Sequence, residues 1–219
     1  MESSARAALI TGGTGRVGRT VAGRLEAEGF TVKAAGRRDG DVARPDEARA
    51  LVERTADELG GLDLVVHAAS DGFRPIPLAE VTEADWDEAH GATAKGAFFV
   101  AQAAAPHLAR ARDGLLVLVE DVAAYQPWPS FAAHCAAKAA EAMLTRVLAR
   151  ALAPDVRVCG VAPGPVAVSE EEAERRARET LLGRVGSADD VAEAVLYLVR
   201  AGFVTGTTVV VDGGRLLAR

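Results

Sequence analysis

The sequence lacks the features that mark several classes of protein. It has two cysteines, Cys135 and Cys159, among 219 residues; they are too few for a disulfide scaffold and are not spaced as metal ligands. No apolar run approaches the roughly 20 residues that a membrane helix needs, and Met1–Arg6 is too short and polar for a signal peptide. Positive charge is in deficit, because the formal net charge is -6, which argues against nucleic acid or an anionic membrane as the main partner. We therefore expect a cytoplasmic protein without a metal site.

The chain does contain a regular alternation of short apolar runs and helical patterns. The runs predict strands of a parallel sheet buried on both faces, at Ala5–Ile10, Thr31–Ala35, Leu62–His67, Leu115–Val119, Val156–Val161 and Thr208–Val211. The helical patterns lie at Val17–Glu28, Pro45–Leu59, near Ala84–Ala109, near Phe131–Leu152 and at Ala188–Leu198. This alternation predicts an α/β fold with a Rossmann-type, doubly wound parallel sheet, as one domain over residues 1–219.

A glycine-rich loop follows the first predicted strand directly and opens the first predicted helix. Glycines let the backbone turn tightly and approach a pyrophosphate, and the helix N-terminus offers oriented N–H groups. The loop therefore predicts dinucleotide binding. Its candidate cofactor-binding residues are Gly12, Thr14, Gly15, Arg16, Val17 and Gly18.

The end of the second predicted strand indicates which dinucleotide binds. An acidic residue there would bind the ribose 2′-hydroxyl of NAD, whereas arginine accommodates a 2′-phosphate. Here the strand is followed by Arg37 and Arg38, and Arg16 in the loop is a third candidate for the same phosphate. The predicted cofactor is NADP(H), bound in a charge-assisted contact.

Three further segments follow the loop in a recognisable order. They are His67-Ala68-Ala69-Ser70, Pro163-Gly164-Pro165-Val166, and Thr205-Gly206 with Val211-Asp212-Gly213-Gly214. Together with the loop they resemble the short-chain dehydrogenase/reductase family over nearly the whole chain, with Arg16 in place of the loop's middle glycine. The resemblance implies that the cofactor also contacts Ala68, Ala69, Ser70, Pro163, Gly164 and Val166.

The resemblance also implies a catalytic site, because three residues stand at the family's Ser–Tyr–Lys spacing. Asp121 comes thirteen residues before His134 and seventeen before Lys138. Aspartate thus replaces the family's serine, histidine replaces its tyrosine, and Thr93 stands at its helix-borne asparagine. Arg16, Asp121 and the pattern Phe73-x-Pro75 lean toward the pteridine reductase branch.

The chemistry of these three residues is coherent. His134 and Lys138 are one helical turn apart and share a face, and Asp121 is expected across from them at a strand end. Imidazole is a competent general acid near neutral pH. With Lys138 on the cofactor ribose, the site predicts an NADP(H)-dependent oxidoreductase that reduces a carbonyl or pterin-like small molecule. Two alternatives stay open: a nucleotide-binding protein without redox turnover, and a non-redox lyase or isomerase.

The chain is short in one place relative to that family, which puts a helix and a third strand before an Asp-Val pair that flanks the adenine. Here Arg37 is four residues before Asp41-Val42, whereas a parallel crossover needs a dozen or more residues. We expect a six-stranded sheet with Thr31–Ala35 at its edge and Asp41-Val42 in a loop beside the adenine. Lys33, the adjacent arginines or a partner subunit would protect the open edge.

The resemblance raises three further questions. Family members commonly form tetramers through the two long helices, so we expect a homodimer or homotetramer, although the alanines there are also simply good helix formers. Ser169–Leu182 lies where the family keeps its substrate lid, and a plain solvated helix is the equal alternative. His67 ends a strand near the expected nicotinamide ribose, where it is either functional or only hydrogen-bonded.

Overall fold

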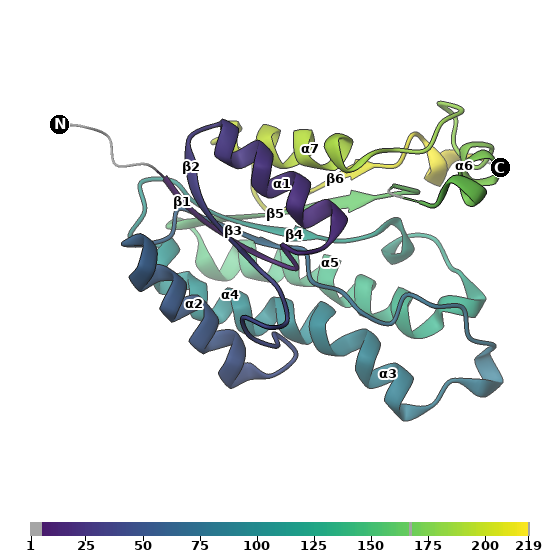
Figure 1. The fold of residues 1–219 in the computed structure, drawn as a ribbon, viewed down its shortest axis with the longest axis horizontal. Coiled ribbons are helices and arrows are strands. Elements are labelled where there is room, and N and C mark those ends of the chain that lie inside the picture. Colours follow the sequence, from purple (N-terminus) through teal and green to yellow (C-terminus); the bar gives the residue numbers. More distant parts are fainter. Residues whose placement is uncertain (1–5, 167, 219) are drawn as a thin grey trace.

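A sheet of six parallel strands forms the centre of the molecule (Figure 1). The structure is a computed structural model, and it describes residues 6–166 and 168–218. The strands are β1 (Arg6–Thr11), β2 (Phe30–Ala35), β3 (Leu64–His67), β4 (Gly114–Val119), β5 (Val156–Pro163) and β6 (Thr208–Val211), in the order β2-β1-β3-β4-β5-β6. The predicted doubly wound fold is confirmed; Ala5, predicted to start the first strand, lies outside the described residues.

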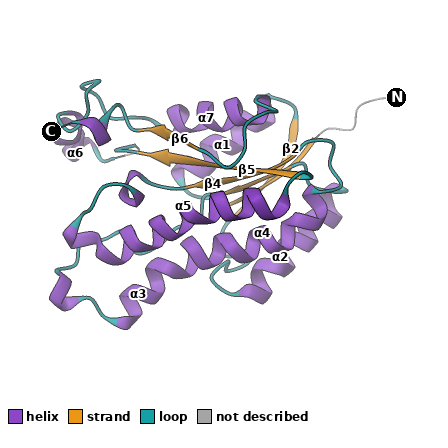
Figure 2. Ribbon diagram, turned by 180° about the vertical axis from the view of Figure 1, so that it is seen from behind, coloured by secondary structure: helices purple, strands orange, loops and turns teal. Residues whose placement is uncertain are grey.

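Helices cover both faces of the sheet (Figure 2). They are α1 (Arg16–Ala27), α2 (Pro45–Leu59), α3 (Glu83–His90), α4 (Gly96–Leu108), α5 (Ala132–Leu152), α6 (Glu170–Ala177) and α7 (Ala188–Arg200). One core cluster joins α1 and α7 to the sheet, and the other joins α2, α4 and α5 to its opposite face. Neighbouring strand residues alternate between the two clusters, as Leu9 and Ile10 do, which explains why the strands read as continuous apolar runs.

The long helix predicted near Ala84–Ala109 is in fact two helices. A π-helical turn, Gly91–Lys95, separates α3 from α4. The turn leaves the carbonyl oxygen of Ala92 2.9 Å from Nε2 of the buried His67, with which it forms a hydrogen bond. Such turns often mark functional sites, and here the turn lies against the carboxyl end of β3.

Strand β2 lies at one edge of the sheet, as predicted. Within residues 6–166 and 168–218 no strand pairs with its outer side, and the chain runs from Gly36 to Arg44 without forming a strand or helix. On this edge Lys33 forms an ion pair of 3.3 Å with Glu58. The charged side chain disfavours strand pairing with another chain.

Candidate active site

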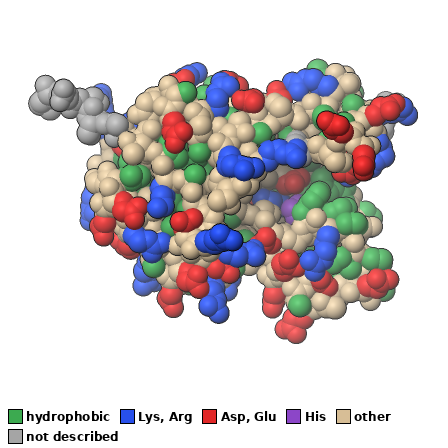
Figure 3. Space-filling view, in the orientation of Figure 1, with side chains coloured by type: hydrophobic (Ala, Val, Ile, Leu, Met, Phe, Trp, Pro, Cys, Tyr) green, Lys and Arg blue, Asp and Glu red, His purple; other side chains and the backbone are tan. Residues whose placement is uncertain are grey.

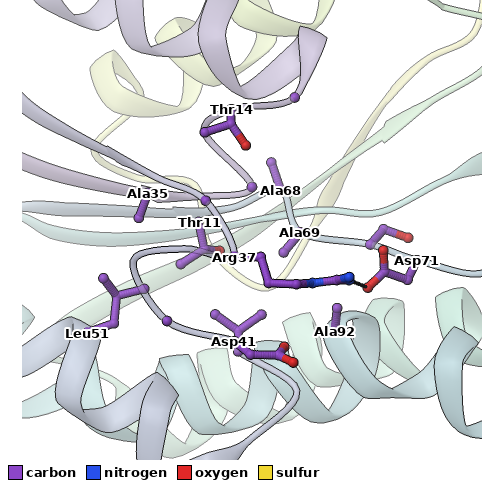
Figure 4. Close-up of a pocket in the computed structure, with 16 residues that line it drawn as sticks. Thr11, Thr14, Ala35, Arg37, Asp41, Leu51, Ala68, Ala69, Asp71 and Ala92 are labelled. Atoms are coloured by element: carbon purple, nitrogen blue, oxygen red, sulfur yellow. Dashed lines mark hydrogen bonds and ion pairs between the residues drawn. The ribbon is translucent and has the colours of Figure 1, made fainter.

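A cleft of about 340 Å³ opens at the carboxyl ends of β1, β2 and β3. Folds of this type place their ligands there. The sequence predicted many of the residues that line it: Gly12, Thr14, Gly15, Arg37, Asp41, Val42, Ala68, Ala69 and Ser70. Figure 4 shows that they come from the glycine loop, the β2–α2 connection and the segment after β3.

The glycine loop has the close packing that a dinucleotide cradle needs. Gly12 has φ +69, and a Cβ there would lie 2.4 Å from the carbonyl oxygen of Ala68. A Cβ on Gly18 would lie 2.3 Å from the carbonyl oxygen of Gly12. Only glycine fits at either position. The loop is therefore packed tightly against the segment that follows β3, and it leads directly into the first N–H groups of α1. The residues present therefore fit a pyrophosphate.

Of the three arginines predicted to meet a 2′-phosphate, the structure brings only Arg37 to the cleft. Its guanidinium forms an ion pair with Asp71, which also lines the cleft (Figure 4). Arg38 is exposed and does not line it. Arg16 donates to the carbonyl oxygen of Val168 at 3.5 Å. Val17, which was also predicted to bind the cofactor, packs against the core.

Asp121 and His134 meet as the spacing predicted. His134 Nε2 lies 3.4 Å from Asp121 Oδ2, a long hydrogen bond. Asp121 is held in turn because its Oδ1 accepts the N–H of Ala123 at 2.8 Å. His134 is almost fully buried, with its ring edge-on to that of Phe73 at 4.9 Å. Its Nδ1 has no hydrogen-bond partner among the described residues.

Lys138 shares the face of α5 with His134 but does not line the cleft. It is 3% exposed, and its ammonium donates to the carbonyl oxygen of Val119 at 2.8 Å and to Glu141 Oε2 at 2.7 Å. The predicted ribose contact would require Lys138 to change partners.

His67 is buried behind the cleft with both ring nitrogens bonded. A carbonyl only accepts, so Nε2 donates to Ala92 and Nδ1 accepts from the Thr11 hydroxyl at 2.8 Å. Burial and the nearby Lys138 charge lower the pKa of His67 to about 4. His67 is therefore neutral and hydrogen-bonded. Thr93, also buried, lies 3.2 Å from Ser70 through their hydroxyl oxygens.

The Pro163–Val166 segment lies at the carboxyl end of β5, away from the first cleft. Gly164 packs so closely on Asp212 that a Cβ would lie 2.7 Å from the Asp212 Cβ. Val166 lines a second cavity of about 420 Å³ together with Leu181 and Leu182. The Ser169–Leu182 region contains helix α6, none of whose residues is buried. This agrees with the expectation of a solvated helix, and a role as a substrate lid stays a prediction.

Three residues of the site were not predicted: Asp71, Glu120 and Glu141. Glu120 is 2% exposed and accepts hydrogen bonds from Thr145, Thr208 and Tyr125. The signal for Glu141 was its helical spacing from His134 and Lys138.

The face that carries these residues is hollowed, and a histidine and acidic side chains are visible beside hydrophobic ones (Figure 3). An aromatic cluster adjoins His134: Phe73 stacks on Phe131 at 4.9 Å, and Trp128 meets Phe131 edge-on at 5.9 Å. Among the described residues no group of His, Cys, Asp and Glu could hold a metal ion. No helix in the described ranges is long and apolar enough to cross a membrane.

Known proteins resemble this chain over almost its full length. A family profile described as enoyl-(acyl carrier protein) reductase matches residues 14–215. The "Granaticin polyketide synthase putative ketoacyl reductase 2" of Streptomyces violaceoruber is 36% identical over 236 residues, covering 94% of this chain and 94% of that protein.

Two solved structures share the fold. The short-chain dehydrogenase/reductase described as glucose/ribitol dehydrogenase from Brucella melitensis has a TM-score of 0.87 and 28% identity, covering 98% of this chain and 99% of that one. A small-chain dehydrogenase in complex with NADPH also has a TM-score of 0.87, with 25% identity, and covers 98% of this chain and 100% of that one.

Proposed function

The chain belongs to the short-chain dehydrogenase/reductase family and is an oxidoreductase of that type, and from this premise we propose that it uses NADPH to reduce a carbonyl or pterin-like small molecule. The observation that carries the proposal is the combination of a glycine-lined cleft containing Arg37 with the pair formed by Asp121 and the buried His134. The similar structure with bound NADPH supports the choice of cofactor.

The cofactor would lie along the residues of the first cleft and extend toward the carboxyl end of β5. The N–H groups of the Gly12–Gly18 loop would hold the pyrophosphate, Arg37 the 2′-phosphate, and the Asp41-Val42 loop the adenine. The backbone of Ala68–Ser70 would support the riboses, and Pro163, Gly164 and Val166 would flank the nicotinamide. When bound, NADPH supplies the hydride.

His134 is proposed as the proton donor to the developing alkoxide. Asp121 orients the imidazole through its contact with Nε2. The imidazole is 3% exposed and the Phe73 ring packs edge-on against it, so the His134 ring must become more accessible before a substrate can reach it. Lys138 is proposed to reach the cofactor ribose after it leaves Glu141.

The surroundings of His134 favour a flat or acyl-chain substrate over a large polar one. Phe73, Phe131 and Trp128 form a partly exposed aromatic wall, which suits a pterin-like ring. The ketoacyl reductase relative supports a carbonyl group as the reacting centre.

A second candidate function is nucleotide binding without redox turnover. The burial of His134 and the pairing of Lys138 with Glu141 favour it, since both groups are turned toward the protein. NADPH fluorescence titration followed by a panel of carbonyl and pterin substrates separates the two functions. Consumption of NADPH with any substrate supports the reductase, and tight binding without consumption supports the alternative.

We also propose a homodimer or homotetramer that acts in the cytoplasm. The unpaired thiols of Cys135 and Cys159 support a reducing compartment. The exposed Phe98, Met143 and Val147 on α4 and α5 support a subunit contact through these helices.

A further inference from the structure

Helix α5 carries a stripe of polar residues along the side that faces the sheet. His134, Lys138, Glu141 and Thr145 are all buried, and their spacing of three or four residues puts them on one face. Three of them contact a residue at or beyond the end of β4. His134 contacts Asp121, Lys138 donates to the Val119 carbonyl, and Thr145 donates to Glu120. The remaining member, Glu141, contacts Lys138 on its own helix.

Glu141 is bonded through only one of its two carboxyl oxygens. Oε2 accepts from Lys138 at 2.7 Å, whereas Oε1 has no hydrogen-bond partner among the described residues. Oε1 lies 4.0 Å from His67 Nε2, and the N–H of that nitrogen is donated to Ala92. Since His67 is neutral, Lys138 is the one cation among residues 6–166 and 168–218 that forms an ion pair with this fully buried carboxylate. Such a group is costly to keep charged.

The ion pair therefore has two states of comparable free energy. Burial raises the pKa of Glu141 to about 7, and Lys138 beside it only partly opposes this shift. The other charged groups around the carboxyl are Glu120 and Asp121, and both raise its pKa further. Near neutral pH the carboxyl can therefore take up a proton, and it then holds the ammonium far less tightly.

We propose that Glu141 is a positioning residue: its carboxylate holds the Lys138 ammonium beneath the cleft, and protonation of Glu141 releases Lys138 toward the ribose of a bound cofactor. The first part stands on the contacts of this chain alone. The second part rests on the proposed function, in which Lys138 contacts the ribose.

Amine labelling tests the first part without any cofactor. The chain has only three lysines, Lys33, Lys95 and Lys138, so mass spectrometry after reaction with acetic anhydride resolves each of them. Glu141→Gln keeps the shape but removes the charge, and we expect it to raise labelling of Lys138 relative to the exposed Lys95 about tenfold, the factor for one lost hydrogen bond between charged groups. The matched control Glu120→Gln removes another buried carboxylate that does not touch Lys138. It should not raise the ratio, because the Glu120 charge raises the pKa of Glu141 and its loss favours the carboxylate that holds Lys138.

The pH dependence of the labelling ratio shows whether protonation of Glu141 releases Lys138 or whether the two residues form a permanent structural ion pair. In the wild-type protein the Lys138 to Lys95 labelling ratio should fall as the pH rises from about 6 to about 8, because Glu141 ionises in that window, and in Glu141→Gln it should stay flat. The wild-type series also serves if Glu141→Gln does not fold. An unchanged ratio in folded Glu141→Gln, or a flat wild-type series, overturns the proposal.

Addition of NADPH tests the second part. In Glu141→Gln, NADPH should protect Lys138 from labelling while Lys95 still reacts. If NADPH quenches protein fluorescence yet leaves Lys138 unprotected, the released lysine does not reach the ribose and the second part is wrong. If NADPH does not bind at all, the proposed function fails, whereas the cofactor-free ratios still decide whether Glu141 holds Lys138.

Discussion

In the proposed NADPH complex, the Arg37 guanidinium would face both the 2′-phosphate and the Asp71 carboxylate with which it is paired. Both residues line the cleft, and Figure 4 shows the Arg37 side chain reaching across toward Asp71. A 2′-phosphate must compete with the Asp71 carboxylate for the guanidinium. We therefore predict that Asp71→Asn binds NADPH more tightly than the wild-type protein does, with a smaller change for NADH.

The expected magnitude follows from the exposure of the pair. The Arg37 side chain is 68% exposed and that of Asp71 is 31% exposed, so solvent screens much of their attraction. Pairs of this kind contribute roughly 0.2–1 kcal/mol, which corresponds to a decrease of about 1.4-fold to 5-fold in the Kd for NADPH. The gain should shrink at high salt, where exposed charges are screened.

Fluorescence titration of NADPH and NADH measures the effect in a double-mutant cycle. The variants are Asp71→Asn, Arg37→Ala and the two combined, with Arg38→Ala as a control that removes an arginine outside the cleft. In the Arg37→Ala background, Asp71→Asn should no longer favour NADPH over NADH. Equal weakening of both cofactors in Asp71→Asn would show that Asp71 binds the cofactor itself, which refutes the competition. Equal Kd values for both cofactors in the wild-type protein would refute a role for Arg37 altogether.

Three further predictions concern catalysis, stability and assembly. His134→Phe should lower the turnover of NADPH by at least about 100-fold, the contribution of a general acid, with the Kd of NADPH unchanged; retained turnover means that the proton comes from another group. Glu141 has its folded-state pKa raised from 4.5 to about 7, so its stabilising contribution is complete below about pH 4.5 and is lost as the pH rises through 7. The free energy of unfolding of the wild-type protein, measured by chemical denaturation, should fall by roughly 3 kcal/mol relative to Glu141→Gln across that window. His67, whose pKa is lowered, changes the free energy of unfolding in the opposite direction over this pH range, and the comparison of the two proteins cancels that change. Parallel curves of the free energy of unfolding against pH for the two proteins would contradict the prediction. Light scattering at micromolar concentration should give the mass of a dimer or tetramer, and a monomer would show that α4 and α5 do not form an interface.

The strands and the shortened connection were predictable because their causes are local. Strands buried on both faces give unbroken apolar runs, so the predicted Thr208–Val211 agrees with β6 and the other strand ends differ by only one or two residues. The three residues between Arg37 and Asp41 are too few for a crossover, whatever the rest of the chain does. The break after His90 was not predictable from propensity, because the turn that forms it bonds its Ala92 carbonyl to His67 on β3, a residue that is distant in the sequence.

Side-chain directions within the site depend on distant parts of the chain. Arg16 was correctly placed in the loop, yet its guanidinium meets Val168, which is 152 positions away. Lys138 and Glu141 look in the sequence like an ordinary solvated pair on an alanine-rich helix. The packing of α5 on the sheet turns the same pair into a buried one. The spacing of Glu141 from His134 and Lys138 indicates the face that they share, but the depth of its burial depends on the sheet.

The segment from Gly36 to Arg44 is held by hydrogen bonds within itself and to α2, and by Val42, which is buried in the core. Asp39 accepts the N–H of Gly36, Asp41 accepts that of Ala43, and Glu47 at the start of α2 accepts that of Asp41. Because β2 has no outer neighbour, nothing in the register of the sheet depends on this segment. We therefore expect that mutation or protein engineering can exchange these nine positions, which include the Arg37 proposed to contact a 2′-phosphate, while the strands and the Asp121–His134 pair stay in place, provided that the buried Val42 is kept.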